Sequence, residues 1–418
     1  TLTAVKGLSP GDTVYISGGP SGSSQTYGLN GSWKLQSGTP SNPITYRIGR
    51  DAPHNGIAVF HTASGKDPWI DAAVSGKNNL HDIVVSGDAG DGRRHFQLSG
   101  FRTVFYINNR SFHLLNWYIG YVDFGNLSTC GSLLHVNGFE LDNCKWHIDD
   151  MNGNGSLTIN FEGTTLGENR IHHCEATAPN DGYGRGVDFI QGGTTGVSVY
   201  NNVFTGYATP EYKGTQHQDG WQPLAGKYLE AYNNIFRNIV NYPIFFEGYY
   251  GGFSHIRIYN NVIVSDLPSM HASAAPRGIM VVPSGNVFKH LGRWPIFDDI
   301  LIANNLIADL GGTHAAIQLQ NQSSRQQSPF TRCQAYNNIY VNGGGFSFDP
   351  AVTTAHNIGF TSARAARRAF RSYTPQSPTN DFRPGNRSSL LPASDTNLSA
   401  YFGTYKNGAP SPSYPTPW

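Results

Sequence analysis

Three acidic side chains precede a repeated pair of asparagines at nearly the same distance. Asp188, Asp219 and Glu247 lie 14, 15 and 14 residues before the second asparagine of the next pair. If successive repeats stack as adjacent strands, neighbouring carboxyl groups lie about 5 Å apart. Like charges at that spacing repel and raise at least one pKa unless a cation intervenes. We therefore expect an outward-facing acidic column that acts in general acid–base catalysis, with Asp219 as first choice, or that binds a hard cation such as Ca²⁺.

Polar and aromatic side chains cluster around these acids. Aromatic rings stack on the C–H faces of sugars, and amides and charged groups bind hydroxyls. The residues that we expect to bind substrate are Arg185, Lys213, His217, Gln218, Trp221, Gln222, Tyr249, Tyr250 and Arg277. The alternative is a solvated acidic patch that basic residues balance without catalysis. Later repeats carry Met280 and Gln318 at the acidic position, so the acids are confined to three repeats, which favours a site.

An internal repeat must position these side chains. Its pattern is apolar-x-apolar-x-Asn-Asn-apolar, and it recurs about every 30 residues, at 197–203, 229–235, 256–262, 300–306 and 333–339. Short alternating strands around a fixed bend are typical of a solenoid of strands rather than of helices. Asparagine tolerates the left-handed backbone that such a bend needs, and stacked amides can hydrogen-bond from repeat to repeat. We expect these asparagines to be structural.

Two weaker copies of the repeat carry cysteine in place of the second asparagine. Cys144 and Cys174 occupy that position, 30 residues apart. We expect buried thiols in preference to a disulfide. His172 and His173 have side chains that suit a metal ion, but their place in the asparagine column favours a structural bend.

Segments near both ends of the chain carry a family resemblance. They are Leu-Ser-Pro-Gly-Asp-Thr-Val-Tyr-Ile-Ser-Gly-Gly at 8–19, Asn-Pro-Ile-Thr-Tyr-Arg at 42–47, and the closing segment 381–418. Together with the repeat, they resemble the pectate-lyase-like family. The resemblance implies an all-β fold, a right-handed parallel β-helix solenoid with an N-terminal cap and an extended C-terminal tail. We expect one domain over 1–418, with cap and first strands over 1–60, solenoid rungs over 61–360, and a short helix and Pro/Ser-rich tail over 361–418.

Composition excludes several classes of function. The 418 residues are 14% charged with a net charge of +1, which gives no basic field for nucleic acid. No apolar run is long enough to cross a membrane, and four cysteines without a Cys-x-x-Cys spacing do not indicate a zinc module. Because the chain begins at Thr1 and not at Met, we expect a processed protein that is secreted or periplasmic. We also expect a monomer without a cofactor.

Several activities fit a carbohydrate cleft on this fold. The resemblance implies polysaccharide lyases, glycoside hydrolases, uronate epimerases or depolymerases, so fold leaves the reaction open. We predict a glycoside hydrolase that degrades a polysaccharide through Asp188, Asp219 and Glu247, although the Asn-Thr-Asp, Gly-His-Gly and Arg-Ile-Lys signatures of polygalacturonases are missing. The first alternative is a lyase or epimerase in which these acids bind Ca²⁺ and Arg185, Lys213, Lys227 or Arg277 is the base or clamp. The second is a carbohydrate-binding adhesin.

Overall fold

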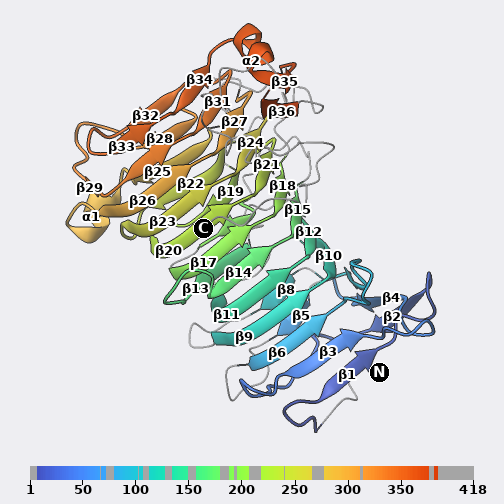
Figure 1. The fold of residues 1–418 in the computed structure, drawn as a ribbon. Coiled ribbons are helices and arrows are strands. Elements are labelled where there is room, and N and C mark those ends of the chain that lie inside the picture. The colour runs from blue at the N-terminus through green and yellow to red at the C-terminus, as the bar shows by residue number, and fades with distance from the viewer. Residues whose placement is uncertain are drawn as a thin grey trace. The chain divides into compact units, whose positions relative to one another are not determined.

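The computed structural model describes residues 7–65, 67–71, 80–101, 103–106, 113–127, 134–148, 157–178, 188–192, 195–206, 218–239, 241–265, 277–310, 314–375 and 381–384. The chain is an all-β protein with the right-handed parallel β-helix fold, in which each coil contributes short strands to parallel sheets (Figure 1). Its internal contacts divide it into two compact units. The first contains strands β1 to β17, and the second contains β18 to β36, with Tyr228–Glu230 of β20 grouped with the first.

The first unit has two long stacks of parallel strands and two shorter ones. One long stack consists of β1 (Thr13–Ile16), β3 (Ile44–Ile48), β6 (His81–Ser86), β9 (His113–Gly120), β11 (Leu134–Asp142), β14 (Asn169–His172) and β17 (Thr195–Tyr200). The other consists of β2 (Ser24–Gly28), β4 (Ile57–His61), β7 (Phe96–Ser99), β10 (Val122–Leu127), β12 (Lys145–Ile148) and β15 (Glu175–Thr177). The shorter pairs are β5 (Pro68–Asp71) with β8 (Thr103–Tyr106), and β13 (Leu157–Phe161) with β16 (Ile190–Gln191).

The second unit winds through three strand positions in each coil. The first position holds β19 (Asp219–Gln222), β22 (Tyr242–Gly248), β25 (Ile279–Pro283), β28 (Ile317–Leu319) and β32 (Phe346–Phe348). The second holds β20 (Gly226–Tyr232), β23 (Phe253–Tyr259), β26 (Phe297–Ala303), β29 (Phe330–Thr331), β30 (Gln334–Tyr336) and β33 (Thr353–Ala355). The third holds β18 (Val203–Thr205), β21 (Ile235–Arg237), β24 (Val262–Val264), β27 (Leu306–Ala308), β31 (Ile339–Val341) and β34 (Ile358–Phe360).

Alternating side chains fill the interior of each coil. In β3, Ile44, Tyr46 and Ile48 are buried while the residues between them are half-buried, as the strand period of two requires. In the second unit the rings of Phe253, Phe297 and Phe330 follow one another, with centroids 5.9 and 4.9 Å apart. Equivalent residues therefore stack from coil to coil, which is how each coil buries the next.

The asparagine pairs form the predicted bend and ladder. The first asparagine of each pair in the second unit has a left-handed backbone, with φ between 54° and 56°. The second is buried, and its Nδ2 donates to the Oδ1 of the next coil's asparagine: Asn234 to Asn261, Asn261 to Asn305 and Asn305 to Asn338 are each 3.0 Å. The prediction that these residues are structural is confirmed.

Cysteines continue the ladder position in the first unit. The thiols of Cys144 and Cys174 are buried and free, as predicted. The backbone N–H of Cys144 donates to Cys174 Sγ at 3.4 Å, and that of Cys174 donates to Asn202 Oδ1 at 2.9 Å. His173, with φ of 53°, occupies the bend position that asparagine holds elsewhere, so the predicted bend forms here.

Two short helices interrupt the coils of the second unit. Helix α1 (Val287–Leu291) lies between β25 and β26, and α2 (Ala363–Ala369) follows β34 at the predicted place. The side chain of Ser362 caps α2 by accepting from Ala365 N at 3.3 Å. Strands β35 (Phe370–Ser372) and β36 (Asp381–Pro384) pair antiparallel after it. Among the described residues, no helix has the length and apolar character needed to cross a membrane.

Candidate functional site

Asp219, the first-choice catalytic acid, is fully buried. It begins β19, and all four residues of this strand are buried instead of alternating. A group that exchanges protons with a substrate must touch it. The prediction that Asp219 faces outward into an open cleft is therefore wrong.

The strand register also separates Asp219 from Glu247. Asp219 pairs with Tyr242, whereas Glu247 pairs with Val282 of the next coil. Five positions at about 3.3 Å each place the backbone of Glu247 roughly 16 Å further along the sheet. The predicted column of adjacent acids does not form. The reason is that β22 continues for three residues beyond the position level with the end of β19, and the corner after it is one residue longer, so counting back from the asparagine pair misaligns the strands.

Glu247 contacts Gln222, another of the predicted site residues, and not Asp219. Gln222 Nε2 donates to Glu247 Oε2 at 3.5 Å, and Gln222 is buried while Glu247 is half-buried. Beside them, Phe245 and Met280 pair in register and pack with Val282 in an apolar cluster. Met280 and Gln318 pair as predicted, although Phe245, and not Glu247, continues their row.

Tyr242 and Arg277 form a cation–π pair next to this cluster. The guanidinium carbon of Arg277 lies 5.1 Å from the centroid of the Tyr242 ring, which stacks on Phe245 at 4.2 Å. Burial raises the pKa of the Tyr242 hydroxyl, and the charges of Asp219 and Glu247 add to the rise, while Arg277 opposes it. Tyr242 is therefore a protonated, half-buried acid at neutral pH.

His314 lies in the field of the same guanidinium. Its side chain is half-buried, and both burial and the charge of Arg277 lower its pKa from the usual 6.5. A neutral imidazole at physiological pH is a proton acceptor. We call Tyr242, Arg277 and His314 the Arg277 cluster. It joins a proton donor, a proton acceptor and a fixed positive charge.

The three aromatic residues that were predicted to stack on a sugar, Trp221, Tyr249 and Tyr250, differ in their exposure. The Trp221 ring is fully buried and packs against Phe246 at 5.0 Å, so it offers no face to a sugar. The Tyr249 ring contacts His290 at 4.7 Å. Tyr250 is 63% exposed and lines a groove of about 430 Å³ together with Trp294 and other residues between β22 and β26. Of the three predicted aromatic residues, Tyr250 is the one with an exposed side chain.

Other predicted site residues stay apart or lie outside the described ranges. Gln218 is buried, and its amide has no hydrogen-bond partner among the described residues. Asp188 is buried in the first unit, whereas Asp219 belongs to the second. Arg185, Lys213 and His217 lie outside the described residues. Their predicted roles stay predictions.

The described residues do not assemble the predicted acids into a metal site. Within the described ranges, the group of three His, Cys, Asp or Glu side chains close enough to share an ion is Asp142, His172 and His173 in the first unit. Sequence reasoning also missed Tyr242 and His314. Neither belongs to the repeat, and the pairing of β19, β22 and β25 brings Tyr242 to Arg277.

The structure is similar to several solved structures, but at low sequence identity. No protein-family model and no curated protein match the sequence. Among solved structures, a mannuronic acid specific polysaccharide lyase from the human gut microbiota has 12% identity and a TM-score of 0.44, covering 83% of this chain and 78% of that one. A pectate lyase has 13% identity and a TM-score of 0.40, covering 93% and 84%. A lacto-N-biosidase from Eubacterium ramulus has 12% identity and a TM-score of 0.31, covering 87% of this chain and 64% of that one. The fold assignment rests on the strand pairing itself.

Proposed function

We propose that this protein is a polysaccharide-degrading enzyme that cleaves a uronate-containing polymer by β-elimination at the Arg277 cluster. The observation that carries the proposal is the Arg277 guanidinium, 5.1 Å from the Tyr242 ring, with His314 in its electrostatic field. A polysaccharide lyase needs a positive group for the uronate carboxylate, a base for the C5 proton and an acid for the leaving oxygen. The cluster supplies one residue for each task.

Arg277 is the carboxylate-binding residue in this proposal. A guanidinium binds a carboxylate through two parallel hydrogen bonds, and it stabilises the negative charge that develops when the adjacent C–H bond breaks. Its own place is fixed at the backbone, where Arg277 N donates to Asn241 O at 2.6 Å. The ring of Tyr242 shields one face of the guanidinium from water, which strengthens its attraction for an anion.

His314 and Tyr242 move the two protons. Neutral His314 takes the C5 proton, and the electron pair of that bond forms the C4=C5 double bond. The C4–O4 bond breaks, and the hydroxyl of Tyr242 protonates O4 as it leaves. The opposite pKa shifts suit these roles, because His314 is held neutral and Tyr242 is held protonated.

Elimination is favoured over hydrolysis because the two acids do not face each other. Inverting hydrolysis needs carboxyl groups about 6.5–9.5 Å apart, and retention needs about 5 Å. Asp219 is buried and its backbone lies roughly 16 Å along the sheet from that of Glu247. In the proposed enzyme, Asp219 raises the pKa of Tyr242 instead of touching the substrate.

A panel of uronate and neutral polysaccharides tests the proposal. We expect new reducing ends together with the ultraviolet absorbance of the C4=C5 bond conjugated to the carboxylate, on uronate polymers alone. Arg277→Lys keeps the charge but removes the two-pronged contact, and we expect it to lose most of this activity. Arg332→Lys, at an exposed ion pair with Asp298 in the same unit, is the matched control. Reducing ends without ultraviolet absorbance would mean hydrolysis and would overturn the elimination.

A further inference from the structure

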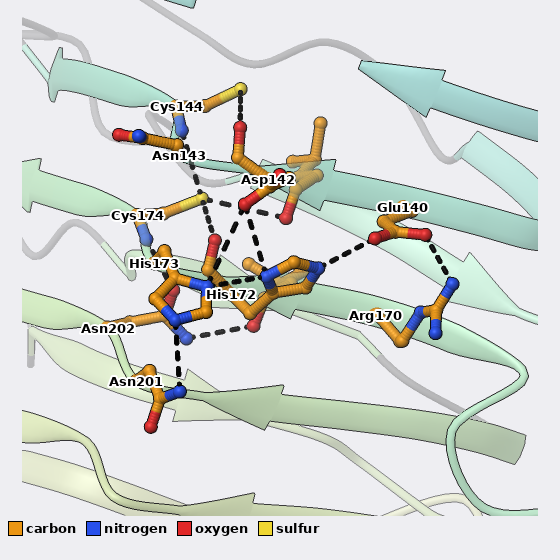
Figure 2. A network of polar contacts seen from close by, with 12 residues as sticks. Glu140, Asp142, Asn143, Cys144, Arg170, His172, His173, Cys174, Asn201 and Asn202 are labelled. Carbon is orange, nitrogen blue, oxygen red and sulfur yellow. Dashed lines mark hydrogen bonds and ion pairs between the residues drawn. The ribbon is translucent and has the colours of Figure 1, made fainter. Parts of the chain in front are cut away.

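One carboxylate oxygen and two imidazole nitrogens meet at the edge of two adjacent coils in the first unit. Asp142 ends β11, His172 ends β14, and His173 follows at the bend (Figure 2). The two Nδ1 atoms of the histidines are 2.8 Å apart. Asp142 Oδ1 lies 3.2 Å from Nδ1 of His172 and 3.7 Å from Nδ1 of His173.

These separations match the spacing of ligands around one zinc-sized ion. Zinc binds imidazole nitrogen at about 2.0–2.1 Å and carboxylate oxygen at about 2.0–2.2 Å in tetrahedral geometry, which places ligand atoms roughly 3.3–3.4 Å from one another. The three observed distances lie on both sides of that value. Shifts of a few tenths of an ångström would complete the geometry.

Each of the three side chains is held by a second polar partner. Glu140 Oε1 contacts His172 Nε2 at 2.8 Å and is itself bound by Arg170. The Tyr118 hydroxyl donates to Asp142 Oδ2 at 2.9 Å. Metal-binding histidines characteristically place their other nitrogen against a carboxylate, which fixes the tautomer and raises ligand basicity. Here that arrangement leaves Nδ1 of His172 directed at the shared point (Figure 2).

The bend supplies the third candidate ligand. His173 takes the left-handed backbone of the asparagine position, and its Nε2 lies 3.1 Å from the side-chain amide of Asn201 in the next coil. When Nδ1 binds an ion, the proton is on Nε2, and a flip of this amide gives it an oxygen acceptor. The His172 ring stacks on Tyr200 at 4.8 Å with an interplanar angle of 10°. Side-chain exposure is 9% for His172, 17% for Asp142 and 53% for His173. The exposed side of His173 therefore gives an ion access from solvent.

We propose that Asp142, His172 and His173 form a binding site for a divalent transition-metal ion of the Zn²⁺ class. Two imidazole nitrogens select such an ion over Ca²⁺ or Mg²⁺, which prefer oxygen ligands. The alternative is a proton-bridged pair of histidines that only braces the bend. The site is independent of the Arg277 cluster, which belongs to the other unit.

The decisive variant is His173→Asn, because asparagine is the residue that the other coils use at this bend. The full chain, without a polyhistidine tag and stripped with EDTA, is titrated with ZnCl₂ by calorimetry, and with CoCl₂ while its visible absorption is recorded. We expect one ion per chain in the wild type and a tetrahedral Co²⁺ spectrum. Loss of a residue that only supports a ligand lowers metal affinity roughly 10–100-fold. Because His173 is itself a proposed ligand, the Zn²⁺ affinity of His173→Asn should fall by more than that.

The matched control is His356→Asn, which replaces a histidine with φ of 53° at the equivalent bend of a coil in the second unit. It should bind Zn²⁺ like the wild type. Asp142→Asn is a second test that keeps the size of the side chain, and it should also weaken binding. Two results would overturn the proposal. One is that the wild type binds Zn²⁺ no better than His173→Asn does, and the other is that His356→Asn loses Zn²⁺ binding as fully as His173→Asn does.

Discussion

Tyr242 pairs in register with Asp219, at the position that residue counting gives to Glu247. This single pairing changes the chemistry of the sheet. It removes the row of adjacent acids and places a tyrosine level with a buried aspartate. The pairing of β22 with β25 then brings the Tyr242 ring to Arg277, so that the candidate site contains one protonated acid and one fixed cation.

Tyr242→Phe removes only the hydroxyl that is proposed to protonate the leaving oxygen. The ring and its stack on Phe245 remain, so we expect thermal stability close to wild type. The kcat should fall about 10²–10⁴-fold, which is the usual contribution of a general acid, while KM changes little. Steady-state kinetics on a uronate polymer measures both. Tyr259→Phe, whose ring stacks on Tyr232 at 4.9 Å on another strand, is the control. Full turnover in folded Tyr242→Phe would remove this residue from the mechanism.

The proposed proton transfers also fix the shape of the pH profile. His314 must be neutral, and its pKa is lowered, so activity should be lost on the acid side only below its usual 6.5. Tyr242 must be protonated, and its pKa is raised, so the alkaline loss should come above its usual 10.0. Between these limits kcat/KM should be flat.

Removal of Arg277 tests why activity should be lost only at low pH, which depends on the lowered pKa of His314. In Arg277→Gln the positive charge that lowers the pKa of His314 is gone, so this pKa should rise. Titration of the His314 ring by NMR gives the answer without relying on activity. An unchanged titration midpoint would show that Arg277 does not act on His314.

The repeat allowed the fold to be predicted because its signal is local. A left-handed bend and a buried amide select asparagine at two consecutive positions, and the same demand returns in five coils, at 201–202, 233–234, 260–261, 304–305 and 337–338. The site depends instead on the register between strands, which the lengths of the strands and of their corners control together. The sequence marks Arg277 as a charge near a strand, but it does not reveal that Tyr242, 35 residues earlier, packs against it. The histidine bend was predicted as structural, and only the distances to Asp142 show three converging ligand atoms.

Asn305→Ala should be among the most destabilising changes in the second unit. Asn305 is fully buried; its Nδ2 donates to Asn338 Oδ1 at 3.0 Å, and its Oδ1 accepts from Asn261 Nδ2 at 3.0 Å. Alanine breaks the amide ladder on both sides and leaves the buried backbone N–H of Asn261 without the Asn305 Oδ1 that accepts from it at 3.0 Å, which costs about 2–4 kcal/mol. A lower midpoint in denaturant-induced unfolding would report the loss.

The adjacent Asn304 provides the control for the ladder. It has φ of 56°, which glycine adopts without strain, so Asn304→Gly should change the free energy of unfolding by less than about 1 kcal/mol. Equal losses in Asn304→Gly and Asn305→Ala would show that the bend, and not the amide ladder, carries the stability.

The buried thiols should resist alkylation in the native protein. Burial is the main cause that raises the pKa of Cys333 to about 11, and burial with the contact to Cys174 raises the pKa of Cys144. Iodoacetamide reacts with the thiolate, so at about pH 8 peptide mass spectrometry should find both unmodified until denaturant is added. Labelling of Cys144 in the folded chain would mean that its coil opens on the timescale of the reaction.

Glu140→Gln tests the proposed metal site through a residue that does not touch the ion. Glu140 holds His172 Nε2 at 2.8 Å, and its negative charge makes the opposite nitrogen a better ligand. Glutamine keeps the size and one oxygen but loses the charge, so Zn²⁺ affinity measured by calorimetry should fall about 10–100-fold while stoichiometry stays at one ion. Glu162→Gln is the matched control, since Glu162 contacts His135 Nδ1 at 2.6 Å in the same unit outside the Asp142, His172 and His173 group. Equal affinities in the two variants would show that Glu140 does not tune a bound metal, and the contact with His172 would then only brace the bend.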